Sequence, residues 1–156
     1  MSPPSDPSTW TLPRLRIARD GAWFHDDQEV THEGILENLR DGLDVDEQGH
    51  YIRIGPVRVP VEVEDAPWIV VRVERQGDQL EIFLNDMTRE RLRPETLRFT
   101  AAAVPYCRVK DGRFEARLGR SAAHQLLALA ESDAEGRHAA LVVGGRRHQL
   151  PEAATG

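Results

Sequence analysis

The feature of this sequence that most restricts its fold is a group of local signals that recurs about ninety residues further along the chain. An Asp-Gly turn starts at Asp20 and again at Asp111, and a glycine turn stands at Gly55 and again at Gly145. Between each Asp-Gly turn and the glycine turn that follows it lies one segment in which apolar residues have helical spacing. Three signals in the same order, at a near-constant offset, predict two related units within the 156 residues.

Between the turns the chain alternates apolar and polar residues, which is the period of a half-buried strand. The clearest case is residues 57–64, where four valines alternate with Arg, Pro and Glu. Pro60 predicts an edge or a bulge in that strand, because proline has no N–H to donate to a sheet. Residues 85–94 are polar and are expected to form a loop. Further strands are expected at 14–18, 22–25, 51–54, 68–74, 79–84, 97–101, 107–110, 113–117, 138–143 and 147–150.

Two segments have the apolar spacing of a helix. The first follows Thr31, a good N-cap residue, and places Ile35, Leu39 and Leu43 on one stripe. The second follows Ser121, which can cap it in the same way. Strand-rich units with one helix each predict an α+β protein.

The domain organisation follows from the repeat. Residues 1–12 are expected to be a flexible N-terminal tail, 13–64 the first repeat unit, 65–104 central strands joining the units, 105–151 the second repeat unit, and 152–156 a tail. Each unit has too few residues for a good core alone, so the two are expected to pack together.

The composition excludes several classes of protein. The one cysteine, Cys107, cannot form an intrachain disulfide and is interpreted as a small core residue. No apolar run is long enough to span a membrane, and the N-terminus lacks the features of a signal peptide, so a cytoplasmic location without membrane contact is expected. A net charge of −6 argues against nucleic-acid binding. No phosphate-loop, dinucleotide, serine-elbow or zinc-ligand pattern occurs, so no cofactor and no metal are expected.

Charge is unevenly distributed along the chain. Residues 1–87 contain 8 basic and 18 acidic side chains, whereas residues 88–156 contain 12 basic and 8 acidic ones. Such asymmetry can steer a charged partner toward the molecule. It can equally bring the two halves together, within one chain or between the chains of an oligomer.

Several polar residues are candidates for a site. Glu62 and Glu64 share one face of a strand, with a spacing that suits acid–base chemistry, although a solvated strand face explains them as well. Asp65 stands before Ala66-Pro67, where an Asp can fix a turn. Arginines alternate at 89, 91 and 93, as in an anion patch or in a solvated loop.

The large aromatic residues on the expected strands have two interpretations. Trp23, Tyr51, Trp68 and Tyr106 most simply supply packing area in a core or at its rim. Alternatively, Trp68 and Tyr106 line a pocket.

Three segments together resemble the bacterial DUF1285 family: D-G-A-W-F-H at 20–25, V-E-V-E-D-A-P-W at 61–68 and P-Y-C-R-V at 105–109. The resemblance covers residues 13–151. It implies two similar small units, each a curved antiparallel sheet, roll-like, packed with one helix. It also implies no established enzymatic activity and a suggested link to signal transduction. The chain departs from the family pattern at 55–58 and at 146–148.

The leading functional hypothesis is a non-enzymatic module that binds a small anionic ligand or a protein partner in a cleft between the units, with Arg108 pairing either an anionic group or Asp65. The expected binding residues are Asp65, Trp68, Tyr106, Arg108, Glu64 and Trp23.

Two alternatives remain from the sequence. The first is a hydrolase-like enzyme for a small anionic substrate, with Glu64 or Asp65 as the general base and Arg108 as the anion clamp. The second is a structural subunit of a homo-oligomer, in which an exposed edge strand at 57–63 adds to a partner sheet.

Overall fold

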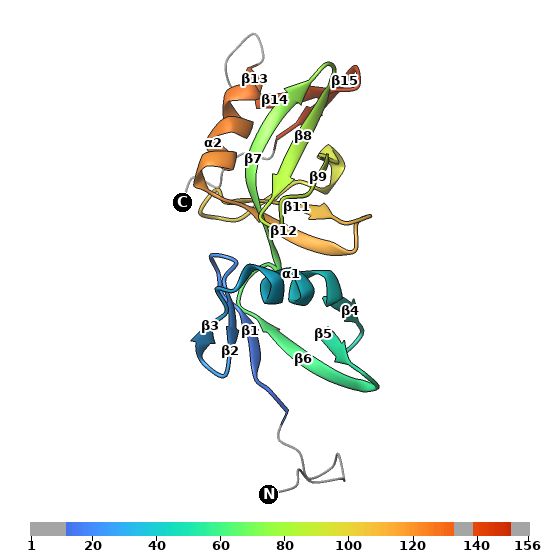
Figure 1. Ribbon diagram of the computed structural model, residues 1–156. Helices are drawn as coiled ribbons and strands as arrows, with labels where there is room; N and C mark the ends of the chain where they lie inside the picture. Colours follow the sequence, from blue (N-terminus) through green and yellow to red (C-terminus); the bar gives the residue numbers. More distant parts are fainter. Residues whose placement is uncertain (1–11, 133–138, 151–156) are drawn as a thin grey trace, which may run out of the picture. The chain divides into compact units, whose positions relative to one another are not determined.

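The computed structural model describes residues 12–132 and 139–150, and its contacts divide the chain into two compact units, Met1–Glu64 and Asp65–Gly156 (Figure 1). Each unit is built on a six-stranded sheet, and a three-stranded sheet is added in the second. The predicted α+β fold of two similar units, each packed with one helix, is confirmed. The tails expected at 1–12 and 152–156 lie outside the described residues, apart from Leu12.

The first unit contains a sheet with strand order β3-β2-β1-β6-β5-β4, in which the central pair, β1 and β6, is parallel and the other pairs are antiparallel. The parallel pair places Leu15 of β1 opposite Val61 of β6. Its elements are β1 (Leu15–Ile17), β2 (Trp23–His25), β3 (Gln28–Glu29), α1 (Glu33–Gly42), β4 (Asp44–Asp46), β5 (Gly49–Ile54) and β6 (Val57–Val63).

The second unit repeats this sheet with the order β10-β11-β12-β7-β8-β9 and adds α2 and the sheet β13-β14-β15. The parallel pair here places Trp68 of β7 opposite Ala116 of β12. Its elements are β7 (Trp68–Gln76), β8 (Gln79–Leu84), β9 (Arg89–Arg91), η2 (Pro94–Thr96), β10 (Arg98–Phe99), β11 (Pro105–Val109), β12 (Phe114–Leu118), α2 (Arg120–Leu129), β13 (Glu131–Ser132), β14 (Ala139–Val143) and β15 (Arg146–Gln149).

The chain runs through the two large sheets in the same way. In each sheet the first three strands lead from the centre to one edge (β1 to β3, β7 to β9). A helix follows (α1, η2), and the next three strands lead from the other edge back to the centre (β4 to β6, β10 to β12). This path aligns β1–β6 with β7–β12. A backbone hydrogen bond recurs at the same point: the N–H of Glu64 donates to Ile17 (3.0 Å), and the N–H of Gly119 donates to Val70 (2.9 Å). The offset of about ninety residues expected from the sequence relates similar hairpins and helices. The equivalent strands of the two sheets are separated by a shorter offset, which is 53 residues between Leu15 of β1 and Trp68 of β7.

The cores of the units follow from the period-2 pattern of the strands. In β8 and β12 every second side chain is buried. The inward residues include Ile17, Trp23 and Val59 in the first unit and Leu80, Ile82 and Leu118 in the second, each between 0% and 1% exposed. The helix α2 covers β7, with Ala122 and Leu126 buried, whereas α1 has no buried residue.

Both predicted helix caps are wrong. The N-cap of α1 is His32, whose Nδ1 accepts from the N–H of Ile35 at 3.3 Å, and Thr31 precedes it. The N-cap of α2 is Gly119, with no side-chain cap, and Ser121 lies inside the helix. The N-cap is the residue just before the first helical residue. Strand β12 ends at Leu118 and α2 begins at Arg120, so Gly119 between them is the cap and the helix starts earlier than its sequence indicates.

Three strand predictions also need correction. Residues 85–94 contain the edge strand β9, because its backbone pairs with β8 despite polar side chains. The acidic segment 44–48, whose composition predicts a loop, contains β4, another edge strand. The strand at 57–63 is not an edge, because β1 and β5 flank it. Pro60 fits there since β1 pairs only from Val61 onward. None of the helices among the described residues is long and apolar enough to cross a membrane.

Candidate functional site

A cluster of polar side chains lies at the start of the second unit, around Asp65. The hydroxyl of Tyr106 donates to the Asp65 carboxylate, 2.7 Å from both oxygens. The Nε of Arg117 lies 3.1 Å from Oδ2 of the same carboxylate, and the Arg117 and Asp65 side chains are 15% and 19% exposed. Strand register explains the meeting, because Tyr106 of β11 stands directly opposite Arg117 of β12. The cluster is a charge pair held in place by a phenol.

The same row of strands extends the cluster to β10. The Arg98 guanidinium lies over the ring of Tyr106, 4.2 Å from its centroid. It also makes two bonds to Glu115, at 2.6 and 2.8 Å, and these bonds raise the pKa of Arg98 above its usual value. Tyr106 is therefore fixed on its face by Arg98 and at its hydroxyl by Asp65.

An open cavity of about 400 Å³ borders the cluster at Arg117. Three segments of the second unit line it: residues 102–105, the end of β12 at Arg117 and Leu118, and one face of α2. Arg120 and His124 are one helical turn apart on that face, and Leu127 follows one turn later. Among the residues that the structure describes, the charged or titratable groups in the lining are all basic: Arg117, Arg120 and His124.

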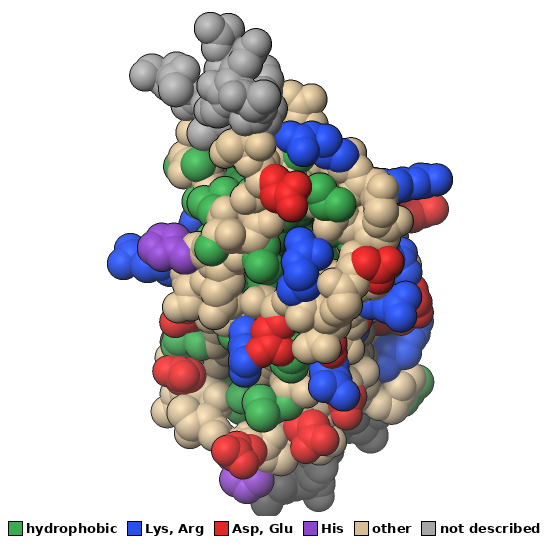
Figure 2. All heavy atoms as spheres, turned by 90° about the horizontal axis from the view of Figure 1, so that it is seen from above, with side chains coloured by type: hydrophobic (Ala, Val, Ile, Leu, Met, Phe, Trp, Pro, Cys, Tyr) green, Lys and Arg blue, Asp and Glu red, His purple; other side chains and the backbone are tan. Residues whose placement is uncertain are grey.

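The wall of this cavity formed by residues 100–104 is a tight turn. The N–H of Ala103 donates to the Thr100 carbonyl at 2.8 Å, and that of Thr100 donates to the Val104 carbonyl at 3.1 Å. Ala103 adopts a φ of 62°, a conformation that non-glycine residues adopt rarely. These two backbone bonds define the turn that forms this wall. Figure 2 shows a face of the molecule on which hydrophobic, basic and acidic side chains all reach the surface.

The predicted partner of Asp65 is corrected by the structure. Arg108 bonds to its own hairpin, with Nε donating to the Gly112 carbonyl at 3.1 Å and Nη2 to the Arg113 carbonyl at 3.2 Å. Arg117, two positions further from the turn on the opposite strand, pairs with Asp65 instead. Arg108 and Arg117 both lie on strands with alternating apolar and polar residues. Only the register of these strands determines which arginine lies opposite Tyr106 and beside Asp65.

The other predicted site residues are dispersed. Trp23 is 1% exposed and belongs to the core of the first unit. Glu64, also in the first unit, accepts from Arg16 Nη1 at 2.6 Å and from the backbone N–H of Arg19 at 3.0 Å. Trp68 is 3% exposed and packs edge-on against Phe114, with ring centroids 6.2 Å apart. The cleft predicted between the units stays a prediction.

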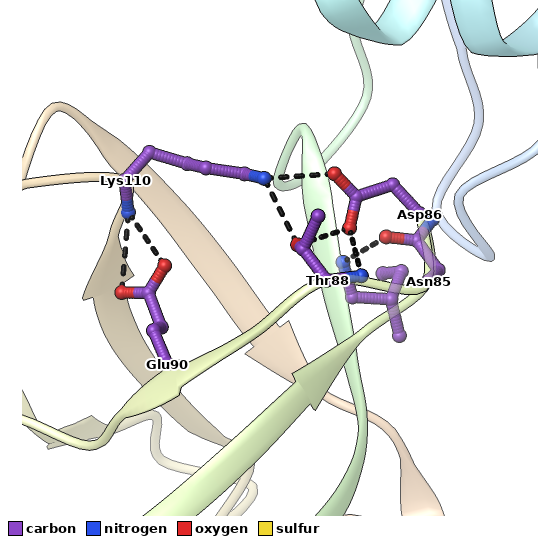
Figure 3. Close-up of polar contacts among 6 residues, drawn as sticks. Asn85, Asp86, Thr88, Glu90 and Lys110 are labelled. Carbon is purple, nitrogen blue, oxygen red and sulfur yellow. Dashed lines mark hydrogen bonds and ion pairs between the residues drawn. The ribbon is translucent and has the colours of Figure 1, made fainter.

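A second polar network, absent from the sequence-based predictions, joins the β8–β9 loop to the β11–β12 hairpin (Figure 3). The amine of Lys110 donates to Asp86 at 2.7 Å and to Thr88 at 3.0 Å, and the backbone N–H of Lys110 donates to Glu90. The amine also lies 4.6 Å from the centre of the Trp68 ring. Lys110 adopts a φ of 56° at the start of the β11–β12 turn.

The arginines predicted as an anion patch lie beside this network. Arg89 pairs with Glu81 at 3.2 Å, and Arg93 lies 3.8 Å from Asp111. A cavity of about 560 Å³ adjoins Arg91 and Arg93, but Glu90, Glu95 and Asp111 line it too. The charge of this cavity is therefore largely balanced by its own carboxylates.

Replacing Asp86 by Asn is expected to lower the free energy of unfolding by about 1–2 kcal/mol, because Lys110 loses its charged partner. Burial raises the pKa of Asp86, but bonds from Lys110 and Thr88 outweigh it and hold the pKa below its ordinary value of 3.8. A lowered carboxyl pKa stabilises the fold at pH values above 3.8 and ceases to do so as the pH falls through the folded-state pKa.

Urea denaturation at several pH values measures this effect. The gap between wild type and Asp86→Asn should be full at neutral pH and should close in acid below pH 3.8. Asp111→Asn is the matched control, because the Asp111 side chain is 97% exposed. A gap that persists at the lowest pH, or an equal loss in the control, would show that the Asp86–Lys110 pair is not its source.

The residues that line the cavity beside Arg117 were missed by sequence reasoning for different reasons. Arg117 was available as the last polar residue of an alternating strand, R-F-E-A-R. Arg120 and His124 have i, i+4 spacing, which marks one helix face, but the earlier start of α2 hid the role of Arg120.

Comparison with known proteins gives a consistent assignment. No protein-family model matches the sequence, and no curated protein matches it. The structure is similar to the crystal structure of a DUF1285 family protein from Silicibacter pomeroyi DSS-3, with a TM-score of 0.70 and 25% identity over 97% of this chain and 88% of that one. A DUF1285 family protein from Shewanella baltica OS155 shares the fold, with a TM-score of 0.58 and 21% identity over 70% of this chain and 86% of that one.

Fold and site thus define a class: α+β proteins with two similar six-stranded units, the second of which has a basic, partly apolar cavity. The likeness to the Silicibacter protein in both fold and sequence, over nearly the whole chain, supports membership of this protein in the DUF1285 family.

Proposed function

We propose that this protein is a non-enzymatic binding module, and that its second unit binds a small organic anion in the cavity beside Arg117. The observation that supports this most directly is the lining of the cavity, in which the described residues include three basic side chains and no carboxylate. Its volume of about 400 Å³ lies in the range of ligand pockets. The larger cavity at β9 is a weaker candidate because its own acidic residues compete with an anion.

The carboxylates argue for binding rather than for hydrolysis. A general base needs a free lone pair within reach of a substrate proton. Asp65 already accepts from Tyr106 and pairs with Arg117, and Glu64 accepts from Arg16 and from a backbone N–H. Both would have to break these bonds before acting as a base. The cluster serves better to orient Arg117, whose side chain also borders the cavity.

Binding by the second unit is compatible with a part in signalling, the role implied by the family resemblance. A ligand that binds only the folded state stabilises it by mass action, and a small module can report ligand concentration in this way. The homo-oligomer alternative loses its stated basis, because the strand at 57–63 is internal to its sheet.

Thermal denaturation with a panel of anions tests the proposal. Propionate, benzoate, octanoate and inorganic phosphate are each added to the full chain, and at ten times its Kd a bound anion should raise Tm by about 3–6 °C. Arg120→Gln should weaken the response about tenfold in concentration, because a hydrogen bond to a charged group is lost. Arg91→Gln removes an equal charge from β9 and should leave the response unchanged.

Two outcomes would count against a site in this cavity. One is the lack of any shift with all four anions. The other is an equal loss in Arg120→Gln and Arg91→Gln, which would indicate attraction to the overall charge of the second unit rather than a site.

A further inference from the structure

The cavity beside Arg117 has a direction, with charge at one end and apolar surface at the other. Arg117 and Arg120 lie where β12 passes into α2, and Leu127 lies two turns further along the helix. Seven residues of helix span about 10 Å. Ala123 lies between the two ends on the same face, and residues 102–105, Ala-Ala-Val-Pro, form the opposite wall. An anionic group and an apolar body can therefore be bound at once.

The apolar end of the cavity exposes hydrophobic side chains to solvent. Leu127 is 51% exposed, although it sits on the helix that covers the sheet. Ala102 and Ala103 across the cavity are exposed as well. Together they leave apolar area uncovered on both walls of a concave site, which gains free energy when an apolar group removes it from water.

The charged end favours a single negative charge. Asp65 already balances Arg117 at 3.1 Å. Arg120 is exposed, and no carboxylate of the described residues pairs with its guanidinium. One guanidinium with no carboxylate neighbour in the described part of the lining matches one carboxylate, which it can bind through two parallel N–H donors. A phosphate dianion would leave part of its charge without a counter-ion.

From this arrangement we infer that the ligand is an amphipathic monocarboxylate, with its carboxylate at Arg120 and an aliphatic chain of about 10 Å running along α2 toward Leu127. This inference rests on the proposed function, because it names the ligand class of the same cavity.

Calorimetric titration of the full chain with acetate, butyrate, hexanoate and octanoate tests the inference. Each methylene that is transferred from water should tighten binding about twofold to fourfold, until the chain outgrows the cavity. Octylamine, which carries the same tail with the opposite charge, should not compete with octanoate. Arg120→Gln should weaken every carboxylate by a similar factor of about ten.

Leu127→Ser tests the tail separately. It should weaken octanoate about fivefold to tenfold and leave acetate and butyrate unchanged, because only the longer chain reaches Leu127. Its fold should be intact, since half of the Leu127 side chain is in solvent. Val71→Ser is the matched control, because Val71 is an exposed apolar residue of β7, 47% in solvent, that does not line the cavity.

The outcomes separate the two proposals. Affinity that depends on Arg120 but stays flat from acetate to octanoate, or tight binding of inorganic phosphate alone, overturns the amphipathic ligand and leaves the anion site standing. An octanoate affinity that changes neither in Arg120→Gln nor in Leu127→Ser overturns both the anion site and the amphipathic ligand. Chain-length dependence lost in Leu127→Ser and kept in Val71→Ser supports both.

Discussion

Replacing Trp68 by Ala is expected to lower the free energy of unfolding by about 3–5 kcal/mol, the usual cost of removing a large buried aromatic ring. Trp68 is 3% exposed, packs edge-on against Phe114 and lies under the amine of Lys110. The cavity left at the start of β7 would loosen the parallel pairing with β12, where Trp68 stands opposite Ala116.

Replacing the same residue by Phe should cost much less, about 1–2 kcal/mol. The indole Nε1 of Trp68 is buried and makes no hydrogen bond within the described residues. Phenylalanine keeps the ring against Phe114 and removes this unpaired donor, so part of the packing loss is offset. Urea denaturation followed by circular dichroism measures both variants. Equal losses in Trp68→Ala and Trp68→Phe would show that packing of a ring against Phe114 is not what stabilises the unit.

Replacing Asp65 by Ala should lower the free energy of unfolding by about 2–4 kcal/mol, because it leaves the poorly exposed Arg117 without its carboxylate. The Tyr106 hydroxyl loses its acceptor at the same time. Tyr106→Phe alone removes one hydrogen bond to a charged group and should cost about 1–2 kcal/mol. The double variant should cost less than the sum, because the two residues share one interaction.

The measurement is again denaturation by urea, with Glu62→Ala as a control at an exposed carboxylate, because the Glu62 side chain is 60% exposed. A loss in Asp65→Ala no larger than in the control would contradict the cluster. So would strict additivity of Asp65→Ala and Tyr106→Phe, since groups in contact do not add.

Alternation along the chain predicted most of the strands because a sheet with one buried face requires it. Val59 and Val61 of β6 are buried, and Pro60 and Glu62 between them are exposed. Short edge strands escape this signal. The backbone of β9 pairs with β8, and its arginines need no buried face, so nothing in R-E-R distinguishes a strand from a loop.

The ninety-residue spacing detected true local likeness, since hairpin, helix and hairpin recur in that order. It could not detect how strands join across a sheet. The parallel pairs β1–β6 and β7–β12 are set by contacts between segments more than forty residues apart, and local sequence does not encode them. The real correspondence of the sheets therefore became visible only from strand order.

The candidate site shows the same limit. Asp65 and Tyr106 were predicted from the family-like segments, and the structure brings them together. Arg108 was expected to pair either with an anionic group or with Asp65, but it bonds to its own hairpin, and Arg117, which lies opposite Tyr106, pairs with Asp65. The two arginines stand on different strands, and their distances from Asp65 depend on the strand register, which local sequence does not encode.

The central claim is that the second unit binds an organic anion in the cavity beside Arg117. The most direct test is titration of octanoate into the isotope-labelled full chain, with backbone amide shifts recorded residue by residue. The account predicts the largest shifts at residues 102–105, at Arg117 and Leu118, and over the first two turns of α2. Saturating shifts centred in the first unit, or no saturable shifts at all, would contradict it.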